Sequence, residues 1–407
     1  MKRIRKCIDG LKDNMIEFTS RLIRIPTVNP PGERYDECAR LLGEKLLSLG
    51  IDWTEVRVPE DRLTDLAPKG AGLPRPSIVG HWGEGQEELH FHGHYDVVPP
   101  LSSEQLRPYV RDGRLYGRGA TDMKGGLTVI LFALQALKEC GVRLTGRLSF
   151  SFTPDEETGG AAGLKYLLDA GYINRAVIGV IDPEPSDGDI INGSRGALSF
   201  DVLVRGKPSH VMVHHLGVNA FEKMVEAATA FAELKKRVEE RKTQFNVKPA
   251  GADRSVLLLG GTCGGGINFN IVPERSFFTV DRRFNPEERL TDVKREIDEV
   301  IASLRQKGVD VETSIFQEGD ASVTGQDEPV CRALSKVIEE VKGKRPEVCI
   351  CPGVLETRFL VEEGIPAVVY GPGLLEVAHG PDEYVPIEEL LDCTEIYALT
   401  AIELLSD

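Results

Sequence analysis

The sequence is short of positive charge and of long apolar runs. Its 407 residues include 49 Lys and Arg against 64 Asp and Glu, which gives a net charge of −15. Nucleic acids and anionic membranes attract basic surfaces, so we expect neither as a partner. The longest uncharged apolar stretch, residues 125–137, is shorter than the roughly 20 residues of a membrane-spanning helix. These absences favour a protein that acts on a small molecule outside the membrane.

Signals for secretion and for disulfide bonding are also missing. The basic amino-terminal residues are followed by further charges instead of the apolar segment of a signal peptide. Eight cysteines are scattered along the chain, and none belongs to a Cys-x-x-Cys pair. We therefore expect reduced thiols and a cytoplasmic location.

The apolar pattern predicts two kinds of domain. Before about residue 195, apolar strands such as 147–153 alternate with helices, which is typical of an α/β layer with a mostly parallel sheet. The order then changes to strand, helix, two strands, helix, strand, the pattern of a small α+β sandwich. We predict an α/β domain formed by residues 1–195 and 316–407, with an α+β domain inserted at 196–315.

Acids and histidines recur at the carboxyl ends of the predicted strands, where open α/β sheets build their sites. They are His94 and Asp96, Asp122, Asp155 with Glu156 and Glu157, Asp182 and Glu184, and His379. Two histidines and three carboxylates would suit two divalent ions of the zinc type. Paired ions about 3.5–4 Å apart, bridged by a carboxylate, can activate one water molecule.

Each of these motifs alone also fits a purely structural role. His94 could be a strand-end histidine satisfied by hydrogen bonds, and Asp122 could cap the helix that follows it. The three adjacent acids 155–157 could form a solvated loop, although their mutual repulsion calls for a nearby cation or for solvent. His90 and His92, earlier in the same strand as His94, are not expected to be ligands. The motifs favour a metal site only together.

Together the motifs resemble the M20 metallohydrolase family. Its members include acetylornithine deacetylase, succinyl-diaminopimelate desuccinylase, aminoacylase and carboxypeptidase G. The resemblance extends from about residue 20 to 400 and rests on five motifs in order. They are His94-x-Asp96, Gly117-Arg-Gly-Ala-Thr-Asp122-Met-Lys-Gly, Asp155-Glu156-Glu157, Glu184-Pro-Ser and His379-Gly-Pro-Asp-Glu.

The resemblance implies a role for each of these residues. It implies that one metal ion is held by His94 and Glu184, that the other is held by Glu157 and His379, and that Asp122 bridges the two. Asp96 would orient the ring of His94, and Glu156 would be the general base. Asp182 is a rival to Glu184 as a ligand, but Glu-Pro-Ser is the string that matches the family.

The resemblance further implies that the inserted domain is a lid and dimerisation domain. His210 would reach across a homodimer to stabilise the oxyanion, and Asn270 and Arg283 would bind the substrate carboxylate or the oxyanion. The family usually has a proline shortly after this histidine, whereas here His214 and His215 follow it. This departure leaves open whether these two histidines take part and which substrate is bound.

We therefore predict a metal-dependent hydrolase that cleaves the amide C–N bond of a small, carboxylate-bearing N-acyl amino acid. N-Acetylornithine and N-succinyl-diaminopimelate are the leading substrate types. A dipeptide, an N-carbamoyl compound or an aryl amine (a hydrolytic deaminase) is the alternative, and a catalytically silent metal-binding protein is the remote one. Two divalent ions are expected. Zinc is the leading candidate, and the same ligands also accept cobalt or manganese.

Overall fold

The computed structural model describes residues 2–249 and 251–406. Its internal contacts divide the chain into two compact units. The first unit comprises Met1–Asn192, Thr324–Val348 and Phe359–Asp407, and the second comprises Gly193–Val323 and Cys349–Arg358. The second unit is thus an insertion in the first.

A twisted sheet forms the centre of the first unit. Its strands lie in the order β1 (Trp53–Arg57), β2 (Pro76–Trp82), β6 (Arg147–Thr153), β3 (Glu88–His94), β7 (Gly179–Pro185), β15 (Ala367–Gly371) and β8 (Ile190–Ser194). The four central strands, from β6 to β15, are parallel to one another. The strands outside them pair antiparallel. The expected mostly parallel central sheet is confirmed.

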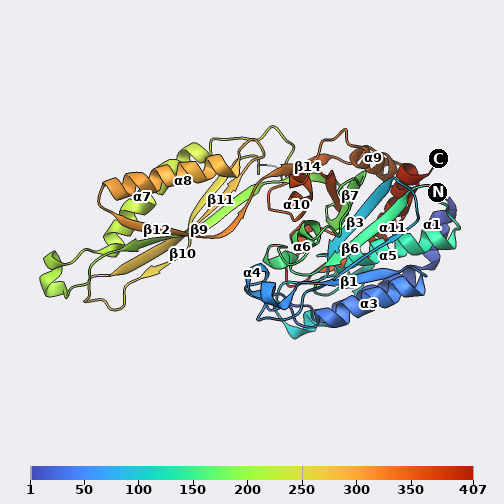
Figure 1. Cartoon of the computed structure of the whole chain (residues 1–407), viewed down its shortest axis with the longest axis horizontal. Coiled ribbons are helices and arrows are strands. Elements are labelled where there is room, and N and C mark those ends of the chain that lie inside the picture. Colours follow the sequence, from blue (N-terminus) through green and yellow to red (C-terminus); the bar gives the residue numbers. More distant parts are fainter. Residues whose placement is uncertain (1, 250, 407) are drawn as a thin grey trace. The chain divides into compact units, whose positions relative to one another are not determined.

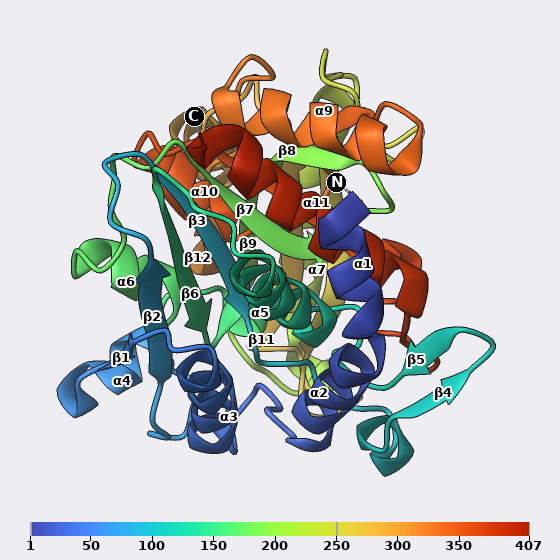
Figure 2. The same ribbon diagram turned by 90° about the vertical axis from the view of Figure 1, so that its right-hand side faces the viewer.

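Helices cover this sheet (Figure 2). They are α1 (Lys2–Gly10), α2 (Lys12–Arg24), α3 (Tyr35–Ser48), α4 (Leu63–Leu66), α5 (Lys124–Glu139), α6 (Leu164–Asp169), α9 (Pro329–Lys342), α10 (Thr357–Glu362) and α11 (Ile387–Leu405). Helix α5 is apolar on nearly every side, which is typical of a helix buried at the centre of a domain. In the described part of the chain, no helix has the length and apolarity needed to cross a membrane.

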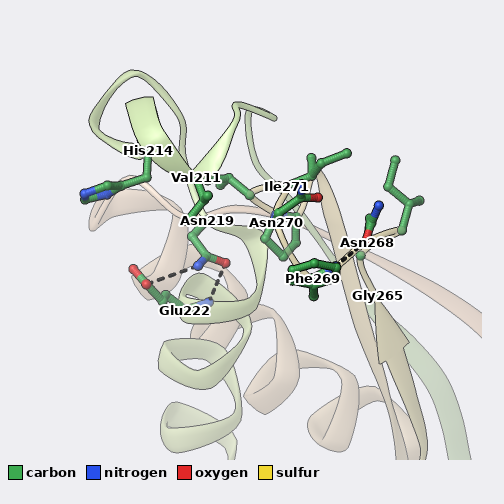
Figure 3. A pocket seen from close by; sticks show the side chains of 13 residues that line it. Val211, His214, Asn219, Glu222, Gly265, Asn268, Phe269, Asn270 and Ile271 are labelled. Atoms are coloured by element: carbon green, nitrogen blue, oxygen red, sulfur yellow. Dashed lines mark hydrogen bonds between the residues drawn. The ribbon is translucent and has the colours of Figure 1, made fainter.

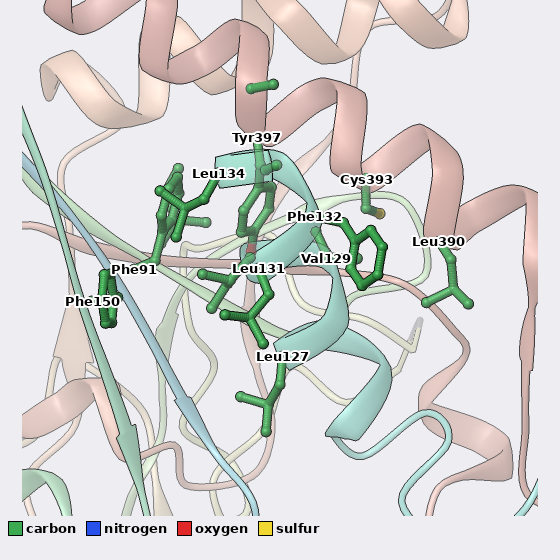
Figure 4. Close-up of a cluster of buried hydrophobic side chains, with 14 of the residues drawn as sticks. Phe91, Leu127, Val129, Leu131, Phe132, Leu134, Phe150, Leu390, Cys393 and Tyr397 are labelled. Atoms are coloured by element: carbon green, nitrogen blue, oxygen red, sulfur yellow. The ribbon is translucent and has the colours of Figure 1, made fainter. Parts of the chain in front are cut away.

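The main core lies between α5, α11 and one face of the sheet (Figure 4). Phe91 of β3 stacks on Tyr397 of α11, with ring centroids 4.9 Å apart. Leu127 and Leu131 of α5 are fully buried in the same cluster. Because side chains alternate across a strand, packing Phe91 against these helices turns His90, His92 and His94 to the other face. The core therefore sets the direction of the histidines.

A small sheet lies beside this core. It has the order β16 (Tyr384–Pro386), β5 (Arg114–Tyr116) and β4 (Tyr109–Arg111), all antiparallel. Gly117 N donates to Glu383 O at 3.0 Å, just past the paired residues. Two loops far apart in sequence, the one after β5 and the one before β16, are thereby held together.

The second unit is an antiparallel sheet with two helices. The sheet order is β10 (Val256–Gly265), β11 (Arg275–Phe284), β9 (Gly196–Arg205) and β12 (Asp310–Gly319). Helices α7 (Ala220–Val238) and α8 (Leu290–Gln306) pack on one face (Figure 1). The expected order of strand, helix, two strands, helix and strand is confirmed. The short strand β13 (Ser322–Val323) pairs with the end of β8, and β14 spans Val348–Cys351.

The face of β3 and β6 opposite the main core carries a buried row of polar side chains. His90 Nδ1 lies 2.7 Å from Ser149 Oγ, and Nε2 lies 2.8 Å from Ser151 Oγ. Burial, with a smaller effect of His92, lowers the pKa of His90 from 6.5 to about 3. His90 is therefore neutral in the folded protein, with one ring nitrogen donating to a serine and the other accepting.

We expect acid to destabilise the fold through His90. Its folded pKa lies below the unfolded value of about 6.5, so the unfolded chain binds the proton first. Stability is then lost as the pH falls below about 6.5, and at pH 5 the loss should be about 2 kcal/mol. Urea unfolding at about pH 7.5 and pH 5 should show a weaker pH dependence in His90→Gln than in wild type. An identical pH dependence in both proteins would contradict this assignment.

Candidate functional site

The carboxyl ends of β3 and β7 bring the first group of side chains together. His94, the last residue of β3, is fully buried. Its Nε2 lies 2.9 Å from Glu184 Oε1 on β7 and 3.3 Å from Asp122 Oδ1. Its Nδ1 lies 3.3 Å from Asp96 Oδ1. The imidazole is thus held by Asp96 on one side and faces two carboxylates on the other.

A second group gathers around His379, which is in the loop before β16. His379 Nε2 lies 3.0 Å from Asp122 Oδ2 and 3.3 Å from Glu157 Oε2. Asp122 is in the turn before α5, and Glu157 is in the short 3-10 turn Glu156–Thr158 after β6. The two oxygens of Asp122 therefore face histidines of two different groups.

Two sets of three donors converge in this region. His94, Glu156 and Glu184 each offer a ligand atom, and these atoms lie within 4.8 Å of one another. Asp122, Glu157 and His379 form a second set under the same condition. The structure thus brings together all five residues predicted as metal ligands, and Glu156 with them. Asp182, buried in β7, belongs to neither of these sets but to a third one with His92 and Glu356, which meets the same condition.

The pKa values of these groups reflect burial and the charges of their close neighbours. Burial alone would lower the pKa of His94, but Glu184, Asp122 and Asp96 raise it well above its usual range. Hydrogen bonds to Asp122 and Glu157 raise the pKa of His379 to about 10. Burial, and then the charge of Asp122, raises the pKa of Glu157 and of Glu184. The carboxylates therefore lack enough positive charge around them.

The donor set fits divalent metal ions. Four carboxylates, those of Asp122, Glu156, Glu157 and Glu184, face only two histidines, so even two imidazolium ions would leave an excess of negative charge. Asp122 Oδ1 is buried, and no hydrogen bond of ordinary geometry reaches it from the described residues. Imidazole nitrogen and carboxylate oxygen are the ligands that zinc, cobalt and manganese accept.

The turn that carries Glu156 and Glu157 is attached to Asp96. Glu156 N donates to Asp96 Oδ1 and Glu157 N donates to Asp96 Oδ2, both at 3.2 Å. The same carboxylate that contacts His94 thus also holds the backbone of the two glutamates. Because consecutive side chains point in different directions, Glu156 belongs to the donor set of His94 and Glu157 to that of His379.

Sequence reasoning missed an ion pair that joins the loops of Asp122 and His379. Glu383 Oε1 accepts hydrogen bonds from Thr121 N and Asp122 N, both at 3.1 Å. Its other oxygen pairs with Arg118 Nη1 at 2.5 Å, and Arg118 Nη2 donates to His379 O at 3.1 Å. Both side chains of the pair are buried. The signal was present in the strings Gly-Arg-Gly and Pro-Asp-Glu, but neither string shows that the two loops meet.

His210 and Asn270 belong to the second unit, on adjoining segments. Val211 N donates to Asn270 O at 3.0 Å, and His210 Nδ1 accepts from Met212 N at 3.2 Å. A pocket of about 590 Å³ adjoins them, with Asn270, His214 and Asn219 in its lining (Figure 3). Asn270 Oδ1 is buried without a hydrogen-bond partner in the described chain. Asn270 thus has an acceptor that a ligand could use.

The remaining predicted residues of the second unit differ in their surroundings. Arg283, on β11, donates through Nε to Asp281 Oδ1 at 2.9 Å. His214 and His215 are exposed on the 3-10 turn Val211–Leu216, with ring centroids 6.1 Å apart. Of the two, His214 is in the pocket lining.

Comparisons with known proteins agree on one family. Residues 90–403 match the sequence profile described as Peptidase family M20/M25/M40. A succinyl-diaminopimelate desuccinylase from Hahella chejuensis is 29% identical over 96% of this chain and 97% of its own. A di-peptidase from Saccharomyces cerevisiae has a similar structure, with a TM-score of 0.77, 16% identity, and 98% and 97% of the two chains covered. A dinuclear metal-binding peptidase from Bacillus subtilis gives a TM-score of 0.68 at 16% identity, with 98% and 99% covered.

Proposed function

Because the chain belongs to Peptidase family M20/M25/M40, we propose that it is a metal-dependent hydrolase of the amide C–N bond in small N-acyl amino acids. The observation that carries this proposal is the convergence of two donor sets on the shared carboxylate of Asp122. The name of the curated relative favours an N-succinyl amino acid among these substrates.

Two divalent ions, zinc first, are proposed as cofactors. His94 and Glu184 would hold one ion, Glu157 and His379 the other, and Asp122 both. When bound, such ions supply Lewis-acid chemistry, which makes water nucleophilic near neutral pH and polarises the amide carbonyl. Asp96 fixes the ring of His94, since a carboxylate on the second nitrogen sets the tautomer of a ligating imidazole.

Glu156 is proposed as the general base. It removes a proton from the attacking water as the new C–O bond forms, and it delivers that proton to the leaving nitrogen as the C–N bond breaks. Its place beside His94 and Glu184 puts it within reach of a water in the same site. The adjacent Glu157 stays available as a ligand of the other set.

The second unit is proposed as a lid and dimerisation domain. His210 would stabilise the oxyanion from across a homodimer, and Asn270 and Arg283 would bind the substrate carboxylate or the oxyanion. Large apolar side chains are exposed on the loops next to His210 and Asn270, with Met212 at 82% and Phe269 at 98%. Such side chains are typical of surfaces that meet another molecule. The proposed location is the cytoplasm, where the eight cysteines of the chain would stay reduced.

A panel of hydrolysis assays tests the proposed function. The metal-loaded protein would be given N-succinyl and N-acetyl amino acids, dipeptides, N-carbamoyl amino acids and amino-substituted aromatic acids. Release of a free amino acid from the N-acyl compounds is the expected result. Turnover of dipeptides, carbamoyl compounds or aryl amines alone would overturn the substrate class, and no turnover at full metal occupancy would overturn the enzymatic function.

A further inference from the structure

Asp96 belongs to a buried network whose other members have no role in the proposed mechanism. It begins at Asn29, in the loop between α2 and α3, which is 2% exposed. Asn29 Nδ2 lies 2.8 Å from Asp96 Oδ2, 3.1 Å from Asp155 Oδ1 and 3.0 Å from Thr158 Oγ1. One amide group thus contacts the carboxylate beside His94 and both ends of the turn that carries Glu156 and Glu157.

The orientation of this amide follows from its neighbours. Two of the three contacts are carboxylates, which accept hydrogen bonds and, when ionised, cannot donate them. A flipped side chain would set Asn29 Oδ1 against both of them, so the nitrogen must face the acids. Consistent with this, Oδ1 has no hydrogen-bond partner among the described residues. Asn29 therefore acts as a donor between two acids.

The backbone of Asn29 is fixed to the segment that follows β3 and Asp96. Asn29 N donates to Val97 O at 2.9 Å, and Val97 N donates to Thr27 O at 3.0 Å. These bonds attach the loop directly after Asp96. A side chain on a backbone held in this way loses little further freedom when it forms its hydrogen bonds, so it can hold its partners firmly.

Arg75 provides the cation that the three adjacent acids require. Its Nε lies 2.5 Å from Asp155 Oδ2, and both side chains are buried. Tyr35 donates to the other oxygen of Asp155 at 3.0 Å. Asp155 has a left-handed backbone with φ of 69°, which costs a non-glycine residue of order 1 kcal/mol. These side-chain bonds hold the strained residue, and with it the start of the turn.

We propose that Asn29 is a positioning residue, which locks the turn of Glu156 and Glu157 to Asp96 and thereby sets the geometry of both donor sets. The inference rests on the proposed function, because it assigns Asn29 to the same site. Asn29 touches none of the proposed ligands through its side chain. It acts through Asp96, which contacts His94, and through Asp155 and Thr158, which flank the glutamates on either side.

The expected effect is large because such sites tolerate little displacement. Loss of a partner behind a metal ligand usually costs about 10–100-fold in metal affinity or activity. A shift of about 1 Å in a reacting group can cost about 10²-fold in rate. Without Asn29, Asp96 and Asp155 would also lose the amide group that lies against both of them.

The test compares Asn29→Ala with Asn192→Ala. Asn192 is an equally buried amide on β8, which donates to Thr324 O at 2.7 Å and contacts none of the site residues. Zinc would be titrated into each metal-free protein against a competing chelator, and thermal melting would be recorded without metal. We expect Asn29→Ala to weaken zinc binding about 10–100-fold and Asn192→Ala to weaken it less than about threefold. The two variants should lose similar amounts of melting temperature relative to wild type.

Kinetics provide a second readout. Against an N-acyl amino acid that the wild type hydrolyses, Asn29→Ala should lower kcat about 10–100-fold with KM within about threefold of wild type. Asn29→Ser keeps one hydrogen-bond donor, so its kcat should lie between those of wild type and Asn29→Ala. It takes the place of the alanine variant in these tests if that variant fails to fold. Wild-type zinc affinity in Asn29→Ala, or equal losses in Asn192→Ala, would overturn the proposal. Wild-type protein that binds zinc but hydrolyses nothing would refute the proposed function, while the zinc titration would still test Asn29.

Discussion

Replacing Glu156 by glutamine should lower kcat by about 10³-fold while two metal ions remain bound. Glutamine has nearly the same shape but cannot accept the proton of the attacking water, and general base catalysis is worth about 10²–10⁴-fold. The metal should remain because Glu156 is not one of the five proposed ligands. The measurement is steady-state kinetics together with metal analysis of the same preparation.

The matched control is Glu60→Gln. Glu60 is also a glutamate in a 3-10 turn, Glu60–Arg62, but it is exposed. It should keep the wild-type kcat. If Glu156→Gln retains more than about a tenth of the wild-type kcat, Glu156 is not the base.

Replacing Asp122 by asparagine should remove at least one metal ion and lower kcat by about 10³-fold or more. Asp122 Oδ1 lies 3.3 Å from His94 Nε2 and Oδ2 lies 3.0 Å from His379 Nε2, so each oxygen serves one donor set. An amide nitrogen cannot take the place of either oxygen as a ligand. Two ions near each other are expected to contribute several kcal/mol to transition-state stabilisation, and loss of one would forfeit much of it.

Thermal stability provides a readout of Asp122→Asn that does not depend on a substrate. A ligand present at about 100 times its Kd stabilises the folded state by about 2.7 kcal/mol. The rise in melting temperature on adding zinc should therefore be smaller in Asp122→Asn than in wild type. Asp61→Asn, an exposed aspartate in the turn Glu60–Arg62, should show the full rise. An undiminished rise in Asp122→Asn, with two ions bound, would contradict the bridging role.

The location of the site was predictable because it depends on strand ends. His94 and Glu184 lie at the carboxyl ends of β3 and β7. These two strands are parallel neighbours in the sheet, so their carboxyl ends meet at the same edge. Alternation along β3 also fixed which face His94 would take, since Phe91 belongs to the core. Patterns of this kind are local, so a sequence displays them directly.

The support behind the site was not predictable, because it depends on contacts between distant loops. The repulsion among residues 155–157 indicated a nearby cation, but nothing in the sequence singles out Arg75, which lies 80 residues before Asp155. Asn29 lies in a Pro-Pro-Gly loop whose sequence indicates only a break between helices. Its contacts come from the pairing of that loop with Val97.

The first residues of α5 were not predictable as helix, because the glycines that allow close packing there also resemble a turn signal. The apolar pattern predicts a helix over 127–138, whereas α5 spans Lys124–Glu139. Gly125 and Gly126 usually indicate a turn. Here a Cβ on Gly126 would lie 2.5 Å from Pro183 O, and one on Gly125 would lie 2.4 Å from Ala120 O. The glycines are needed so that the helix can approach its neighbours, which single-sequence propensity does not reveal.

The most direct test of the central claim is hydrolysis of an N-succinyl amino acid measured against metal content. Zinc would be added stepwise to metal-free protein, with bound metal and initial rate recorded at each step. The two donor sets predict that the rate of hydrolysis rises with bound zinc and levels off near two ions per chain. Glu156→Gln should bind the same amount of zinc with no comparable rise in rate. Full binding of two ions with no hydrolysis of any N-acyl amino acid, or hydrolysis by the metal-free protein, would contradict the account.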